Sequence, residues 1–307
     1  MNSFPEHLRR HEIPEPVALV KGNGDLAKIS VKTDWSTAEI YLLGAHVTEF
    51  QKNGEPPLLF MSKASQFIVG KPIRGGVPIV FPWFGPREGH ALHGFARLTE
   101  WEWKGSSVAP DSSVTLRFRL PDSAACADGS PPATVIFAVT VSDKLVMELT
   151  VGNPFGTDSL SFENCLHTYF AIGDIAEGEI TGLKGTTFID RVGSVTQRVE
   201  SADAIRINSE TDRLYLDTTQ TVEIQDLRHR RKIAVEKSGS ASTVVWNPWA
   251  EKARNMPDLG DDEFKYMLCV ESGNVAQNKI TLAPGKSTYL KVTLSSHQIE
   301  AARELAR

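Results

Sequence analysis

Val114-Thr115-Leu116-Arg117-Phe118-Arg119-Leu120 alternates apolar and polar residues without a break. Side chains of a β-strand point alternately to opposite faces of a sheet, so this stretch predicts a strand with one face in a core. The same alternation recurs at 221–225 and 289–294. Continuous apolar runs at 135–139 and 266–270 are typical of strands that are buried on both faces.

Helical patterns are scarce outside these runs. Residues 299–305 repeat apolar side chains at helical spacing and predict a short helix after Ser296, and a turn or two of helix is expected at 248–252. Many strands and few helices together predict an all-β fold, namely one large antiparallel β-sandwich with few short helices.

A single domain is expected to span residues 1–307, with its core at about 26–295. The strand pattern continues past residue 130, which argues against the alternative of two β domains divided near that point. The Gly-, Pro- and Ser-rich segment 121–132 predicts an exposed loop, and the basic cluster 228–232 predicts a charged hairpin tip.

The composition of the 307 residues excludes several classes of protein. The 33 basic and 38 acidic residues give a net charge of −5, which argues against a nucleic-acid-binding protein because such proteins usually carry a basic stripe. Three widely spaced cysteines show neither metal-ligand spacing nor a disulfide framework. There is no signal core and no apolar span of about 20 residues, so we expect a cytoplasmic protein with no membrane partner. Its expected oligomeric state is a monomer or a weak homodimer.

A Pro- and Gly-rich segment at 71–86 contains Arg74 directly before Gly75 and Gly76. Its prolines exclude an ordinary central strand, since proline cannot donate to a strand ladder. A permanent cation beside bare backbone favours a site for an anion. A rigid structural loop whose arginine pairs with a carboxylate explains the same pattern equally well.

A second segment, 89–97, places His93, Gly94 and Arg97 close together, which provides a hydrogen-bond donor, an open backbone and a cation. The histidines at 90 and 93 could also bind a metal together with His167 and Glu271. Zinc sites usually show a clearer ligand spacing than this, so we expect no metal.

His167 and Glu271 each lie in an apolar, strand-like stretch. A histidine in such a setting is usually a core histidine whose hydrogen bonds are satisfied. An unpaired buried carboxylate is costly, so Glu271 needs a partner, a solvent-lined cleft or a chemical task. A run of this kind can also end at a surface turn, so the pattern alone leaves both interpretations open.

In their order along the chain, these segments resemble the aldose 1-epimerase (mutarotase) superfamily, and most closely its glucose-6-phosphate 1-epimerase, or hexose-6-phosphate mutarotase, branch. The resemblance covers most of residues 40–295 and implies a galactose mutarotase-like supersandwich. It implies His167 as general acid and Glu271 as general base, with no cofactor and no metal. It also implies four substrate-binding residues: Arg74, His93, Arg97 and Asp212. Further matching segments are 44–46, 82–85, Trp101, 166–170, 182–183 with Asp190, 210–215, 245–249, and 269–271 with Asn274.

The activity implied by the resemblance is interconversion of the α and β anomers of an aldohexose 6-phosphate, a small-molecule sugar phosphate, with glucose 6-phosphate as the expected substrate. Ring opening needs a base for the C1 hydroxyl and an acid for the ring oxygen. Reference pKa values of about 4.3 and 6.5 suit glutamate and histidine to these tasks, and two arginines suit the phosphate. The chain departs from the branch at Leu92, where glutamine is frequent, which concerns substrate preference more than the reaction.

Three alternatives stay open at this point. A carbohydrate-binding β-sandwich without turnover would stack tryptophans such as Trp83 and Trp246 on sugar faces, but it needs no histidine–carboxylate pair. A mutarotase for unphosphorylated aldoses would use the same pair. A glycoside hydrolase or lyase needs a second carboxylate, for which Asp212 is the candidate.

Overall fold

Two antiparallel eight-stranded sheets contain most of the strands in a computed structural model that describes residues 15–125, 133–154 and 157–299. The first sheet contains, in spatial order, β13 (Gly178–Thr181), β17 (Val222–Asp226), β18 (Arg231–Ser238), β22 (Ser287–Gln298), β9 (Leu145–Gly152), β8 (Thr134–Val141), β7 (Val114–Arg119) and β6 (Glu102–Val108). The second contains β15 (Thr196–Val199), β14 (Thr187–Asp190), β16 (Thr211–Leu216), β19 (Ser242–Asn247), β20 (Met267–Asn274), β11 (Asn164–Leu166) and β5 (Ile79–Val80), and β12 (Tyr169–Ala171) also pairs with β20.

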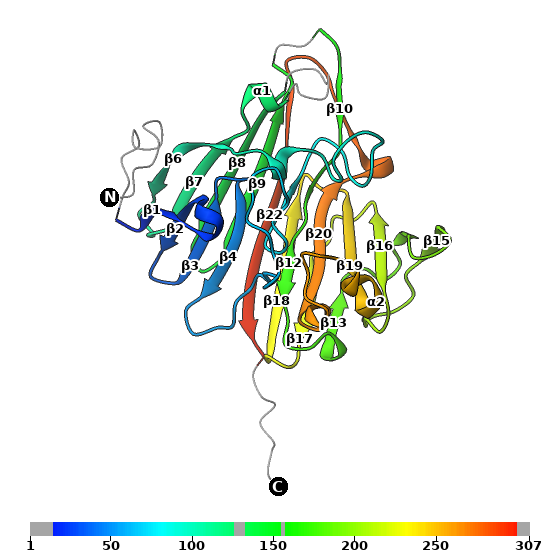
Figure 1. Ribbon diagram of the computed structural model, residues 1–307. Helices are drawn as coiled ribbons and strands as arrows, with labels where there is room; N and C mark the ends of the chain where they lie inside the picture. The colour runs from blue at the N-terminus through cyan, green and yellow to red at the C-terminus, as the bar shows by residue number, and fades with distance from the viewer. Residues whose placement is uncertain (1–14, 126–132, 155–156, 300–307) are drawn as a thin grey trace.

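Smaller elements complete the structure. A four-stranded sheet is formed by β1 (Val17–Lys21), β2 (Ala27–Lys32), β3 (Ser36–Tyr41) and β4 (His46–Lys52), and β10 (Leu160–Phe162) pairs with β21 (Ile280–Leu282). The α-helices are α1 (Asp122–Ala125) and α2 (Trp249–Arg254), and the 3-10 turns are η2 (Asn23–Asp25), η3 (Ala96–Leu98), η4 (Ile175–Glu177), η5 (Glu263–Tyr266) and η6 (Ala276–Asn278). In Figure 1 the blue four-stranded sheet lies on the side of β6–β9, where β3 contacts β8, and α2 lies beside β16 and β19.

Alternation of side chains explains how the sheets form a core. In β7, Val114, Leu116 and Phe118 are fully buried, whereas Arg117 between them is exposed. Every residue of β20 is buried, as the continuous apolar run predicts for a central strand. The main core cluster runs from Val17 to Leu294 and draws on both large sheets and the four-stranded sheet. The predicted all-β antiparallel sandwich is therefore confirmed.

Of the two predicted helices, one is confirmed and the other is wrong in its first residues. The helical turn predicted at 248–252 is confirmed as α2. The helix predicted after Ser296 is wrong as far as Gln298, because β22 continues to that residue by pairing with β18. The rest of that predicted helix, from residue 300, lies outside the described residues. So does the part of the predicted 121–132 loop at 126–132, which follows α1.

The basic cluster at 228–232 lies where β17 turns into β18, as the predicted hairpin requires. Arg231, however, is not on the tip: its side chain is 0% exposed and its Nε donates to Asp226 Oδ2 at 3.1 Å. The guanidinium also donates to the carbonyls of Pro56 and Ala171. One arginine of the cluster thus joins the first sheet to β12 of the second. Among the described residues no helix is long and apolar enough to cross a membrane.

Candidate active site

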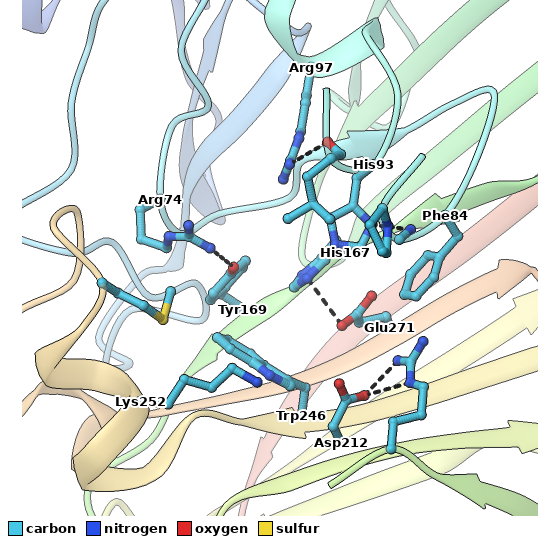
Figure 2. A pocket seen from close by; sticks show the side chains of 15 residues that line it. Arg74, Phe84, His93, Arg97, His167, Tyr169, Asp212, Trp246, Lys252 and Glu271 are labelled. Carbon is cyan, nitrogen blue, oxygen red and sulfur yellow. Dashed lines mark hydrogen bonds and ion pairs between the residues drawn. The ribbon is translucent and has the colours of Figure 1, made fainter. Parts of the chain in front are cut away.

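A cavity of about 440 Å³ lies on the second sheet, over β12, β16, β19 and β20. This volume is within the usual range for small-molecule sites. The chain segments on either side of β5, together with α2, complete its walls. The six residues predicted for the site all line this cavity, as Figure 2 shows: Arg74, His93, Arg97, His167, Asp212 and Glu271.

An interruption of the strand ladder positions the histidine. Strand β11 pairs with β20 up to Leu166, and β12 resumes the pairing at Tyr169. His167 and Thr168 are left between these two ladders, opposite Val270 and Glu271 of β20. Since the chain departs there from regular pairing, the His167 ring can lie beside the Glu271 carboxyl group.

The imidazole Nε2 of His167 lies 3.2 Å from Glu271 Oε1, close enough for a hydrogen bond or proton transfer (Figure 2). Only 7% of His167 and 1% of Glu271 is exposed. The His167 ring is stacked on Tyr169 with centroids 4.8 Å apart, and Trp246 meets it edge-on at 6.1 Å. This packing fixes the plane of the imidazole, so its nitrogen stays directed at the carboxyl group.

Burial shifts the pKa values of this pair in opposite directions. Desolvation raises the pKa of Glu271 to about 8, against a smaller lowering effect of Arg191, and lowers the pKa of His167 well below 6.5. The favoured state of the free site near neutral pH is therefore a protonated carboxyl group beside a neutral imidazole. This differs from the expected carboxylate and imidazolium, although the pair holds the same number of protons in both states.

Two predicted arginines line the cavity, and in Figure 2 Arg74 lies at the left and Arg97 extends down from the top. Arg74 donates from Nη1 to the Tyr169 hydroxyl at 2.8 Å and from Nη2 to Asp258 Oδ2 at 3.0 Å. Arg97 donates from Nη2 to the Leu92 carbonyl at 2.7 Å. The buried Nε atom of each arginine has no hydrogen-bond partner within the described part of the chain. Each guanidinium is thus held in place at the cavity wall by its Nη contacts.

His93 is held as a neutral imidazole. Its Nδ1 accepts a hydrogen bond from the Gly85 N–H at 3.0 Å, which leaves Nε2 as the protonated nitrogen. Burial, together with the charge of Arg97, lowers the pKa of His93 to about 3. His93 can therefore donate a hydrogen bond from Nε2 to a ligand, but it does not add a positive charge.

The glycines after Arg74 have a different role from the one predicted. Gly75 and Gly76 are buried and do not line the cavity, so they offer no open backbone to an anion. Gly76 has a φ of +60°, and a Cβ there would lie 2.3 Å from the Val47 carbonyl oxygen. These glycines let the loop pack tightly against β4, which fixes the position from which Arg74 extends.

Asp212 lies on β16 and shares the cavity wall with Arg191. Arg191 donates from Nε and Nη2 to Asp212 Oδ1, at 2.9 and 2.6 Å, and its guanidinium lies 5.1 Å from the centre of the Phe84 ring. Both contacts occupy the same carboxylate oxygen. The second oxygen, Oδ2, is left to accept from a ligand hydroxyl.

Among the lining residues that were not predicted for the site, three carry a charge or a hydroxyl group. Tyr169 stands two residues after His167, a spacing that would have indicated a shared strand face. Arg191 directly follows Asp190, which belongs to a matched segment. Lys252 carries no such signal: it lies on α2 and pairs with Glu210 at 2.8 Å.

One group of possible metal ligands lies at the site. Among the described residues, His167, Cys269 and Glu271 each offer a ligand atom, and these atoms lie within 4.8 Å of one another. Burial raises the pKa of the Cys269 thiol well above 9, so the sulfur is held protonated, which opposes metal binding. His90, considered above as a ligand, is exposed and packs edge-on against Trp83.

A buried histidine–carboxyl pair, flanked by cations and by other hydrogen-bonding side chains, is typical of the active site of an acid–base enzyme. The comparison with protein families then gives the class its name. The model of the family described as "Aldose 1-epimerase" matches residues 27–295, and the chain belongs to this family of isomerases.

Similar proteins agree with this assignment. The chain is 34% identical over 296 residues to a protein of Cenchrus ciliaris, covering 93% of this chain and 89% of the relative. It is 34% identical over 260 residues to a protein of Salmonella typhimurium, covering 84% and 86%. Both relatives carry the name "Putative glucose-6-phosphate 1-epimerase". The crystal structure of the "putative mutarotase (YeaD)" from Salmonella typhimurium superposes with a TM-score of 0.86 at 30% identity, over 94% of this chain and 96% of that one.

Proposed function

We propose that this epimerase interconverts the α and β anomers of an aldohexose 6-phosphate, with glucose 6-phosphate as its substrate. The observation that carries the proposal is the His167–Glu271 pair, whose Nε2 and Oε1 atoms lie 3.2 Å apart in the wall of the cavity. The name borne by the relatives from Cenchrus ciliaris and Salmonella typhimurium supports this choice of substrate.

The reaction begins with the single proton that the pair shares. Its transfer from Glu271 to His167 gives a carboxylate and an imidazolium. Glu271, as general base, takes the proton of the C1 hydroxyl while His167, as general acid, protonates the ring oxygen O5. The C1–O5 bond breaks, and C1 becomes an aldehyde carbon.

Ring closure reverses these transfers. The aldehyde turns about the C1–C2 bond, the O5 hydroxyl attacks its other face, and His167 takes the O5 proton back. Glu271 returns a proton to the C1 oxygen, which leaves a carboxylate and an imidazolium. Transfer of the shared proton from His167 back to Glu271 then restores the starting state. This sequence consumes no redox equivalent and forms no covalent bond to the protein.

The charges of the cavity suit a phosphorylated sugar. Its lining contains more cations than carboxyl groups, and the pKa of Glu271 keeps that group neutral near pH 7. Guanidinium groups bind phosphate more strongly than neutral hydroxyls, so we assign the phosphate to Arg74 and Arg97. His93 Nε2 and Asp212 Oδ2 then serve the sugar hydroxyls. The cationic residues are Arg74, Arg97, Arg191 and Lys252, and the acidic ones are Asp212 and Glu271.

Magnetisation-exchange NMR on glucose 6-phosphate, glucose and galactose, measured side by side, tests this function. We expect the anomers of glucose 6-phosphate to exchange much faster than in buffer, and faster than those of the two unphosphorylated sugars. Exchange no faster than in buffer would contradict the proposal. Faster exchange of glucose would make an unphosphorylated aldose the substrate, and line broadening without exchange would indicate a carbohydrate-binding protein without turnover.

A further inference from the structure

The carboxyl group of Glu271 has a second partner besides His167. The thiol of Cys165, on the neighbouring strand β11, lies with Sγ 3.6 Å from Glu271 Oε2, a hydrogen-bonding distance for sulfur. Both side chains are buried. The imidazole therefore faces one oxygen of the carboxyl group, Oε1, and the thiol faces the other.

The position of the thiol depends on a residue that lacks a side chain. Cys165 pairs directly with Gly273, two residues after Glu271 on β20. A Cβ at Gly273 would lie 2.8 Å from the Cβ of Cys165 and 2.5 Å from the Asn164 carbonyl oxygen, closer than real contacts allow. Cys165 thus occupies the space above Gly273, and from there its sulfur reaches along the strand to Glu271.

The thiol donates to Oε2 in this contact, and its sulfur is a much weaker acceptor than the neutral imidazole nitrogen that faces Oε1. Burial, followed by the nearby Glu271 carboxyl, raises the pKa of Cys165 well above 9, so the group stays S–H throughout the working range of pH. An oxygen that accepts a hydrogen bond from S–H does not also point a proton at it. When Glu271 is protonated, its proton is consequently favoured on Oε1, the oxygen that faces His167.

We propose that Cys165 is a positioning residue for the acid–base pair: by occupying Oε2 as a donor, it keeps the exchangeable proton of Glu271 on Oε1, where His167 can receive it. Its effect on turnover rests on the proposed function. The contact itself does not, which allows the two to be tested separately.

The kinetic test compares Cys165→Ala, Cys165→Ser and Cys269→Ala. Loss of the donor in Cys165→Ala should lower kcat about 3- to 10-fold with little change in KM, as expected for one hydrogen bond. Because the thiol favours the ionised carboxyl group, its loss should also move the alkaline limb of kcat/KM to higher pH, by about half a unit. Cys165→Ser keeps a donor, so it should retain the kcat of the wild type. Its alkaline limb of kcat/KM should stay at the wild-type pH or move to lower pH.

Cys269→Ala is the matched control, since Cys269 is also a buried thiol beside the pair but makes no hydrogen bond to Glu271 among the described residues. We expect its pH limb to stay where the wild type has it. If Cys165 had a purely structural role, Cys165→Ala and Cys165→Ser would both be less stable, and neither would move the alkaline limb of kcat/KM. That result would overturn the proposal. An equal shift in both Cys165 variants would overturn it as well.

An infrared measurement on the ligand-free protein reports the contact without any substrate. The S–H stretch of Cys165, identified by its loss in Cys165→Ala, should change in frequency in Glu271→Gln, and the C=O stretch of protonated Glu271 should move to higher frequency in Cys165→Ala. Unchanged bands would overturn the proposal. These band shifts in a protein that shows no anomer exchange would refute the proposed function and leave the thiol contact established.

Discussion

Burial reverses the ordinary protonation of the Glu271 and His167 side chains. In water a glutamate loses its proton well below the pH at which a histidine does. In the cavity the pKa of Glu271 rises to about 8 while that of His167 falls well below 6.5, because neither charge is solvated. The pair therefore retains one transferable proton over the whole range between these two values.

This state determines the pH dependence of the reaction. We expect kcat/KM to stay level as pH rises through 6.5 and to decline only as pH passes about 8, where Glu271 loses the shared proton. An imidazolium with an ordinary pKa would instead lose activity as pH rises through about 6.5, and that profile would contradict this account. Glucose should be measured beside glucose 6-phosphate, because the phosphate itself titrates near pH 6.

Arg191 is the residue through which the position of Asp212 can be tested. Arg191→Lys keeps the positive charge but loses the double contact to Asp212 Oδ1 and the stacking on Phe84. We expect KM to rise roughly tenfold with a smaller change in kcat, since a binding contact is misplaced.

Arg213→Lys is the matched control for this substitution. Arg213 has the same kinds of contact outside the cavity wall, an ion pair with Glu200 at 3.2 Å and a stack on Phe188 at 5.1 Å. Its KM should stay at the wild-type value. Equal KM changes in both variants would show that Arg191 has no particular role in the site.

At the scale of elements, the interruption between β11 and β12 is what creates the site. Regular pairing would have given His167 a ladder partner on β20 and fixed its direction by the alternation of the strand. Alternation along the sequence predicts strands such as β7 well, but it carries no sign of where a ladder stops. The C-terminal end shows the same limit: pairing of β22 with β18 continues to Gln298, two residues beyond Ser296, after which the sequence pattern predicts a helix.

The hairpin of β17 and β18 offers a test of how the sheets are joined. Arg231→Met removes the buried partner of Asp226 and the bonds to the Pro56 and Ala171 carbonyls. We expect it to destabilise the protein by about 3–5 kcal/mol in chemical denaturation, since a buried carboxylate is left with less compensation. Arg228→Met, on the exposed tip of the same hairpin, should change stability by no more than about 0.5 kcal/mol. Similar values for the two would contradict a stabilising role of Arg231.

At the scale of the whole molecule, the fold brings together residues that the sequence separates widely. Arg74 and His93 come from loops before β6, whereas Asp212 and Glu271 lie on strands of the second sheet. The resemblance to the aldose 1-epimerases indicated six of the residues that line the cavity, because their order along the chain is itself a signature. It could not indicate the reversed protonation of Glu271 and His167, the ion pair of Arg191 with Asp212, or the contact of the Cys165 thiol with Glu271. These features depend on burial and on contacts made only after folding.

The central claim is that the buried Glu271–His167 pair exchanges the anomers of a hexose 6-phosphate. Magnetisation exchange between α- and β-glucose 6-phosphate, recorded with wild-type protein and with Glu271→Gln at equal concentration, tests it most directly. We predict rapid exchange with the wild type and a rate lower by about 10²–10⁴-fold with folded Glu271→Gln, as expected for the loss of a general base. Equal exchange rates for the two proteins would contradict the claim.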